Sequence, residues 1–186
     1  MVIYPGSELA GLQLHLLQSH RAPELFALVN RCRDQLRPWL SGIDSTRELS
    51  DSQKFIKEKL EIFAKTGAPT LGVFLQNQMV GVVSFNTVNS HGRVADIGYW
   101  LAPEFQGRGI MTHAAACLVN YGFSELKLHR IQIRAATENR PSRAVAERLG
   151  FTLEGIIRET EWLYDRFVDH ALYSVLSYEW PGCWRR

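Results

Sequence analysis

A short glycine-rich segment, Gln106-Gly107-Arg108-Gly109, carries the strongest chemical signal in this sequence. It follows an apolar run, residues 97–101, that is typical of a buried strand, and it precedes a helical run over residues 110–125. Glycines let the backbone approach a ligand closely, and the first N–H groups of a helix lack partners within the helix. The helix dipole also favours negative charge at that end, so the segment predicts a phosphate-binding loop.

The spacing around this loop excludes two common nucleotide-binding motifs. A Walker A loop needs Lys and then Ser or Thr after its last glycine, whereas Gly109 is followed by Ile110 and Met111. The dinucleotide fingerprint needs a third glycine and an acidic residue about 20 positions later. Thr112 and His129 stand at those positions. A helix cap without a ligand is the plain alternative for this segment alone.

A second possible centre is the pair His113 and Cys117, which lie four residues apart in the helical run. Such a pair can act as a thiol nucleophile with its base. Three alanines precede Cys117 and a leucine follows it, and this pattern favours a buried, inert thiol. The three cysteines, with Cys32 and Cys183, are too few and too scattered for a disulfide framework or a zinc site. We therefore expect no metal.

Length and charge favour one compact, soluble domain. A domain near 186 residues buries roughly 70% of the surface that its unfolded chain exposes. The 21 basic and 19 acidic residues leave a formal net charge of +2, too weak a field to argue for nucleic acid. The first residues lack the pattern of a signal peptide, and no apolar run approaches the ~20 residues of a membrane span. We expect a cytoplasmic protein without a nucleic-acid or membrane partner.

The elements that must hold the loop alternate between strands and helices. Ser50 and Gln53 have the spacing of a capping box before a helix that carries Ile56, Leu60 and Phe63 on one face. The expected strands are residues 12–17, 70–75, 80–85, 93–101, a segment near Ile131, and about 153–164 and 168–180. The expected helices besides 110–125 are residues 22–36, one after Ser50, and 142–149. This alternation predicts an α/β protein with a mixed sheet.

The loop also resembles a known one. Gln106-x-x-Gly109-x-Met111 is similar to the Gln/Arg-x-x-Gly-x-Gly/Ala acyl-CoA loop of the GCN5-related N-acetyltransferase (GNAT) superfamily. Met111 replaces a small residue of that pattern, so its side chain must point away from the pyrophosphate. Later segments resemble the second half of a GNAT domain: Asn139-x-x-Ser142, Leu149-Gly150-Phe151 and Glu154-Gly155. Glu161-Trp162-Leu163 resembles the Glu-Tyr-Leu segment of the RimJ/RimL branch, which acetylates the N-termini of ribosomal proteins.

The resemblance implies a fold and a co-substrate. We expect residues 1–186 to form a single GNAT domain with a mixed, mostly antiparallel twisted sheet, helices on both faces and a splayed central strand pair. Acetyl-CoA would lie in the splay, with its acetyl carbonyl near a backbone N–H at Leu101. The expected cofactor-binding residues are Tyr99, Trp100, Leu101, Gln106, Gly107, Arg108, Gly109, Ile110, Met111, Thr112, Asn139 and Ser142.

The resemblance also implies catalytic roles for Glu161 as the base and Ser142 as a donor to the leaving thiolate. A free α-amino group has a pKa of about 8, so a modest base suffices. Partial burial beside Trp162 could make Glu161 a better base. The residues alone leave plain alternatives, a solvent-facing carboxylate on a strand and a serine that caps a helix. Tyr99 and Tyr164 are the next candidate acids.

The acceptor is the least defined part of this prediction. Trp39 and Leu40 could line its cleft, and Arg31, Arg33 and Arg37 could favour an acidic peptide or simply be solvated. The expected acceptor is a protein N-terminus of the ribosomal-protein type that the RimJ/RimL branch acetylates. The alternatives are a small-molecule amine such as a polyamine or aminoglycoside, and a non-catalytic acyl-CoA-binding module.

Family members are often homodimers. We expect Trp180 and Trp184, near the end of the chain, to supply contact surface for a second copy.

Overall fold

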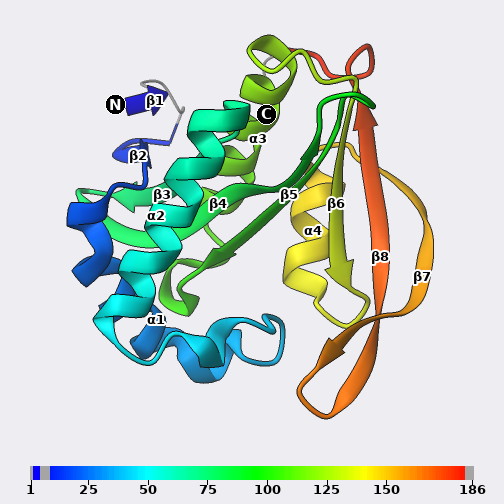
Figure 1. The fold of residues 1–186 in the computed structure, drawn as a ribbon. Coiled ribbons are helices and arrows are strands. Elements are labelled where there is room, and N and C mark those ends of the chain that lie inside the picture. The colour runs from blue at the N-terminus through cyan, green and yellow to red at the C-terminus, as the bar shows by residue number, and fades with distance from the viewer. Residues whose placement is uncertain (1, 5–8, 183–186) are drawn as a thin grey trace.

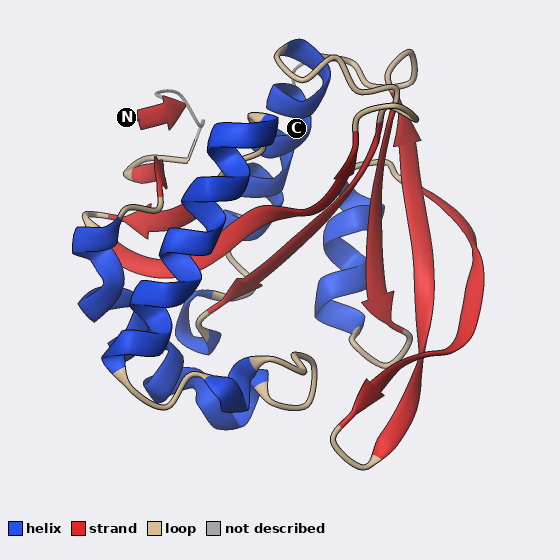
Figure 2. Cartoon of the chain, in the orientation of Figure 1, coloured by secondary structure: helices blue, strands red, loops and turns tan. Residues whose placement is uncertain are grey.

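The computed structural model describes residues 2–4 and 9–182, which form a sheet flanked by helices (Figures 1 and 2). The strands are β1 (Val2–Tyr4), β2 (Leu12–Leu16), β3 (Thr70–Leu75), β4 (Gln78–Asn89), β5 (Val94–Leu101), β6 (Arg130–Ala136), β7 (Thr152–Leu163) and β8 (Arg166–Leu176). The helices are α1 (Ala22–Leu36), α2 (Leu49–Thr66), α3 (Ile110–Ser124) and α4 (Arg140–Arg148). Short 3₁₀ helices are η1 (Ser19–Arg21), η2 (Ile43–Ser45) and η3 (Pro103–Phe105).

The strands form one eight-stranded sheet in the order β1-β2-β3-β4-β5-β6-β8-β7. The β5–β6 pair is parallel, and the other neighbouring pairs are antiparallel. Parallel pairing runs only from Val94–Arg130 to Ile97–Ile133, after which β5 and β6 diverge (Figure 1). The expected mixed, mostly antiparallel sheet with a splayed central strand pair is confirmed.

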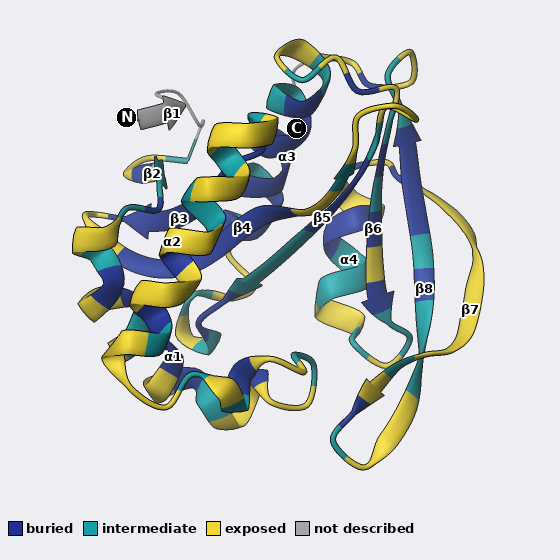
Figure 3. Cartoon of the chain, viewed as in Figure 1, coloured by how far each residue is buried: buried dark blue, intermediate teal, exposed yellow. Residues whose placement is uncertain are grey.

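Helices cover both faces of the sheet, as expected. α1 and α2 pack over Phe74, Met79 and Val82 on one face, and α3 and α4 pack on the other (Figure 1). The buried side of α1 follows from its sequence, because its buried apolar residues recur at helical spacing (Figure 3). The predicted bounds of this helix, residues 22–36, are confirmed. None of the helices in the described residues has the length and apolar character of a membrane span.

The cap of α2 differs from the prediction. The side chain of Glu48 accepts from the backbone of Asp51, and the Asp51 carboxylate accepts from the Glu48 N–H at 2.9 Å. The capping box is therefore Glu48–Asp51 rather than Ser50–Gln53. Ser50 lies inside the first turn, where its hydroxyl donates to Glu48 Oε1 at 2.5 Å. The prediction failed because a carboxylate can serve as the N-cap acceptor in place of a hydroxyl.

The end of the last strand also differs from the prediction. β8 ends at Leu176 instead of continuing to Trp180, because the chain turns and the Leu176 N–H donates to Glu179. Trp180 is buried against Phe123 and Phe151, and its Nε1 donates to Asn120 Oδ1 at 2.6 Å. Its expected role as contact surface is therefore wrong, since the ring belongs to the core. Trp184 and Cys183 lie outside the described residues.

Candidate functional site

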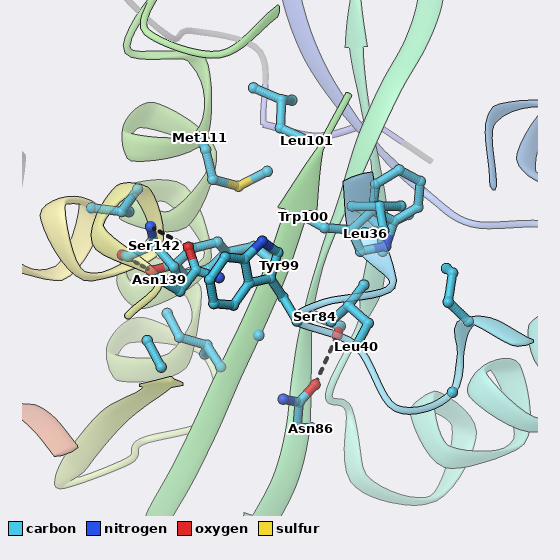
Figure 4. A pocket seen from close by; sticks show the side chains of 18 of the residues that line it. Leu36, Leu40, Ser84, Asn86, Tyr99, Trp100, Leu101, Met111, Asn139 and Ser142 are labelled. Carbon is cyan, nitrogen blue, oxygen red and sulfur yellow. Dashed lines mark hydrogen bonds between the residues drawn. The ribbon is translucent and has the colours of Figure 1, made fainter. Parts of the chain in front are cut away.

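A cavity of about 1400 Å³ lies where β5 and β6 separate, and its wall includes residues from both faces of the sheet. Figure 4 shows Asn139 and Ser142 on one side of β5 and Leu36 and Leu40 on the other. The expected residues on the wall are Trp39, Leu40, Tyr99, Trp100, Leu101, Gln106, Gly107, Gly109, Ile110, Met111, Thr112, Asn139, Ser142 and Glu161. The structure thus brings together the two halves of the predicted site.

The glycine segment forms a tight loop at the end of β5. Gly107 and Gly109 have φ angles of 72° and 75°, a left-handed conformation that side chains rarely adopt. Gly109 is the N-cap of α3, and no side chain caps that end of the helix. Gln106 Nε2 donates to the Leu101 carbonyl at 3.1 Å and so ties the loop back to the strand. The loop can therefore present free N–H groups to an anion.

The first turn of α3, which follows the loop, is buried in the core. Ile110, Met111 and Thr112 are buried, and Met111 packs with the core of α3 and the sheet. The Met111 side chain therefore packs largely in the core. This agrees with the expectation that it points away from the pyrophosphate. Arg108 is exposed, with its guanidinium 5.9 Å from the centre of the Phe105 ring, and it does not belong to the cavity wall.

Strand β5 offers both side chains and a backbone edge to the cavity. Tyr99 packs with the core on the α3 side, whereas Trp100 packs with the core of α1. This alternation is the period-two pattern of a strand. Beyond Ile97 the strand pairs only with β4, so its other edge faces the splay. Leu101 is buried at the end of that edge.

Ser142 does not cap α4, in contrast to the simplest expectation for this residue. Asn139 is the N-cap, and its Oδ1 accepts from the Ser142 N–H at 3.2 Å. Ser142 therefore stands in the first turn of α4, and its hydroxyl is not the cap. The Ser142 carbonyl accepts from the Tyr99 hydroxyl at 2.8 Å. Burial raises the pKa of Tyr99 well above its usual range, so this phenol is a poor proton donor.

Glu161 reaches the cavity from β7 and is held at both carboxylate oxygens. Oε1 accepts from Ser41 Oγ at 2.9 Å, and Oε2 lies 3.0 Å from His170 Nε2. The neighbouring Trp162 does not enclose the carboxylate as expected, because its ring is exposed and packs edge-on against Phe167. Consecutive strand residues point to opposite faces, which places polar rather than aromatic partners beside Glu161.

The loop after α1 forms the wall opposite α4. Its Leu40 carbonyl accepts from the Tyr164 hydroxyl at 2.9 Å, so that hydroxyl is already engaged.

Arg37 pairs with Asp44 at 2.9 Å and lies over the Tyr164 ring. Arg33 donates to the Ile43 and Thr46 carbonyls, and Arg31 pairs with Glu104. These arginines hold loops in place, which removes the main reason for expecting an acidic peptide.

Several polar residues of the cavity were not expected from the sequence. Ser41 was missed because it meets Glu161 from a distant loop, and His170 because its contact depends on the register of the β7–β8 hairpin. Asn86 lies at a bulge of β4, where pairing steps from Phe85–Ile97 to Thr87–Asp96. The end of the largely apolar run at Phe85, where the polar Asn86 follows, was the available signal for this bulge.

A buried carboxylate marks the base of the splay. Asp96 accepts from Gln132 Nε2 at 2.7 Å, from Arg134 Nε at 3.1 Å and from Thr87 Oγ1 at 2.5 Å. These bonds join β4, β5 and β6 just before the two central strands separate. The network therefore fixes where the cavity begins.

The other candidate pair, His113 and Cys117, lies on α3 and is not part of the cavity wall. His113 Nδ1 lies 3.0 Å from the Gly109 carbonyl, at the start of α3, and Cys117 is half-buried one turn further on. Within residues 2–4 and 9–182, no three His, Cys, Asp or Glu side chains cluster as metal ligands do.

Comparisons with known proteins identify several relatives. The acetyltransferase (GNAT) domain family matches residues 12–152. The putative ribosomal N-acetyltransferase YdaF of Bacillus subtilis is 34% identical over 92% of this chain and 94% of its own. The solved structure of RimL, a ribosomal α-N-protein acetyltransferase in complex with coenzyme A, has a TM-score of 0.89 at 28% identity, covering 95% and 98% of the chains. The microcin C7 self-immunity acetyltransferase MccE, solved with acetyl-CoA and AMP, has a TM-score of 0.85 at 32% identity over 90% and 93%.

Proposed function

This chain belongs to the GNAT family of acetyl-CoA-dependent N-acetyltransferases, and we propose that its acceptor is the N-terminal α-amino group of a ribosomal protein. The similarity to YdaF and RimL supports this acceptor class. The structural observation that carries the proposal is the continuity of the cavity. One space holds both the glycine loop and Glu161 and opens across the sheet, so a donor and an acceptor can meet from opposite faces.

The residues on the donor side fit an acyl-CoA. Nothing lies within 4 Å of the position that a side chain would take at Gly107, so the loop leaves room for a bulky anion. We propose that the N–H groups of residues 107–112 hold the diphosphate, with Arg108 as an outer counter-charge. The unpaired edge of β5 beyond Ile97 would hold the amide-bearing arm. When bound, acetyl-CoA supplies an acetyl group that is activated as a thioester.

On the acceptor side, Glu161 would accept the proton that the attacking amine loses. The Ser142 hydroxyl would donate a hydrogen bond to the departing thiolate, and Asn139 would hold the turn that presents it. Trp39 and Leu40 would line the entrance for the acceptor chain. The proton thus passes from the nitrogen to Glu161 as the new amide forms, and the thiolate leaves with the carbon–sulfur electron pair, stabilised by the hydrogen bond from Ser142.

A small-molecule amine, such as a polyamine or an aminoglycoside, is the second candidate acceptor. MccE, which was solved with AMP as well as acetyl-CoA, is a similar protein that binds a second small molecule. We also propose that the protein works in the cytoplasm without a nucleic-acid partner. We propose further that it forms a homodimer. Light scattering at high micromolar concentration tests the dimer, and a monomer there contradicts it.

An acceptor screen tests the proposed function. Purified bacterial ribosomal proteins, polyamines and an aminoglycoside are each incubated with the protein and isotopically labelled acetyl-CoA. We expect label on the N-terminal peptide of one or a few ribosomal proteins by mass spectrometry. Label on a small amine alone would replace this acceptor with the second candidate. Binding of acetyl-CoA without turnover of any amine would indicate a non-catalytic module.

A further inference from the structure

The two oxygens of the Glu161 carboxylate have partners of different character. The His170 side chain at Oε2 is only 14% exposed, whereas Ser41 at Oε1 belongs to an exposed loop. A carboxylate accepts hydrogen bonds and donates none, so Nε2 of His170 carries the hydrogen in this contact. One oxygen is therefore held from inside the protein, and the other meets a group that can move.

The backbone of His170 is held by strands on both sides. It pairs with Ala136 of β6 and with Ile157 of β7, so the imidazole projects from the interior of the sheet. Central strand positions of this kind have little freedom to shift, because both backbone edges are bonded. His170 is thus a rigid partner for the carboxylate.

A bulge in β7 separates the position that pairs with His170 from Glu161, which lies on the same face of the hairpin as His170. Pairing steps from Ile157–His170 to Glu161–Val168, so three residues of β7 stand opposite Asp169 alone. Glu159, within this bulge, has a φ of 47°, which is uncommon for a residue other than glycine. Its N–H donates to Asp169 Oδ1 at 2.8 Å, which fixes the bulge. Bulges next to active sites commonly re-aim a side chain.

From this geometry we propose that His170 is a positioning residue for acetyl transfer, holding Oε2 of Glu161 so that Oε1 faces the acceptor amine. The exposed Ser41 hydroxyl donates to Oε1, the oxygen that would accept the proton of the amine. This inference rests on the proposed function, because it assumes that Glu161 accepts the proton. His170 acts through Glu161 and contacts neither substrate.

Two substitutions of equal length separate the donor of His170 from its bulk. His170→Met removes the donor, and His170→Gln keeps an N–H donor at a similar reach. Ser174→Ala serves as the control, because it loosens the same strand at a contact with Arg130 and Glu154, outside the cavity wall. Release of free thiol from acetyl-CoA is measured with the mixed ribosomal proteins of the acceptor screen, alongside thermal unfolding and calorimetric acetyl-CoA affinity.

We expect His170→Met to lower turnover by roughly 10- to 100-fold, the effect of misplacing a catalytic group by about 1 Å. His170→Gln should recover most of this loss, and acetyl-CoA affinity should stay within about threefold in both variants. In a Glu161→Gln background, His170→Met should cause no further fall. The Ser174→Ala control should lower the unfolding temperature without this loss of turnover.

Five results would overturn the inference or its premise. Parent-like turnover of His170→Met shows that His170 has no positioning role, and so does an equal loss in His170→Met and His170→Gln. A full further loss in the Glu161→Gln background shows that His170 does not act through Glu161. Parent-like turnover of Glu161→Gln alone, or no turnover of any ribosomal protein by the parent, removes the proposed function and the inference with it.

Discussion

The Tyr99 hydroxyl donates to the Ser142 carbonyl at 2.8 Å and thereby joins β5 to the first turn of α4 across the splay. This bond joins two parts of the cavity wall. It also uses the hydrogen that a catalytic acid would need to give away. Since burial raises the pKa of Tyr99 as well, the residue fits a structural role better than that of an acid.

Tyr99→Phe should therefore lower the stability of the fold noticeably and the turnover rate only slightly. Loss of one buried hydrogen bond should lower the free energy of unfolding by about 0.5–1.5 kcal/mol. Turnover should fall by less than about tenfold, whereas removal of a general acid costs roughly 10²–10⁴. Urea denaturation and thiol release measure the two effects. A loss of turnover in the larger range would return Tyr99 to the list of acids.

Gly109→Val should weaken acetyl-CoA binding by at least about tenfold, or 1.4 kcal/mol, while the fold persists. The φ of 75° at this N-cap is strained for a β-branched residue, so the loop must change shape. Gly150→Val is the matched control, since Gly150 has a φ of 77° but lies outside the cavity wall. Both variants should lose stability, and only the first should lose affinity by calorimetry. Unchanged affinity in folded Gly109→Val removes the loop from the site.

The glycine loop could be predicted because its geometry is local. Positive φ at two glycines, a strand end and a helix start all lie within residues 97–112, and each leaves a mark on composition. The helix over 22–36 was equally accessible, because its buried face repeats at helical spacing and Pro23 marks its first turn. The splay and the acyl-CoA came from the resemblance, since backbone edges leave no trace in side chains.

The contacts of Glu161 could not be predicted in the same way. Ser41 is 120 positions away from it, in a loop whose place is set by the whole fold. His170 lies on the neighbouring strand, and its contact with Glu161 depends on the register of β7 against β8, which the sequence does not specify. The cap of α4 was missed for a simpler reason, because Asn139 and Ser142 are both good N-caps and only the backbone chooses between them.

That choice makes Asn139 and Ser142 experimentally separable. Asn139→Ala should lower the free energy of unfolding by about 1 kcal/mol, as loss of an N-cap does. Ser142→Ala should change it by less than about 0.5 kcal/mol. Ser142→Ala should instead lower turnover with little change in the pH profile, since water can partly replace a donor to the thiolate. Thermal unfolding and pH-dependent thiol release test the pair. A large loss of stability in Ser142→Ala would make it a structural residue.

A pH-dependent contribution to stability should come from Glu154. Hydrogen bonds from Arg130 and Ser174, both at 2.5 Å, lower the pKa of Glu154 to about 2. The unfolded carboxyl has a pKa of about 4.3, so the contact stabilises the fold above that value and is lost as pH falls toward 2. Glu154→Gln should cost about 1 kcal/mol at neutral pH, allowing for solvent screening. Denaturation curves from pH 7 to about 3 should show the two proteins converging; a constant difference would contradict this origin.

Glu161→Gln is the decisive test of the chemistry. It keeps size and much of the hydrogen bonding but removes the base, so turnover should fall by roughly 10²–10⁴. Acetyl-CoA affinity should barely change, because the loop and β5 are expected to hold the donor. The residual rate should climb with pH toward the amine's pKa of about 8, since free amine must now form in solution. Turnover within about threefold of the parent at neutral pH would make Glu161 a structural strand residue. A water chain would then be the next candidate base, because the Tyr164 hydroxyl already donates to Leu40.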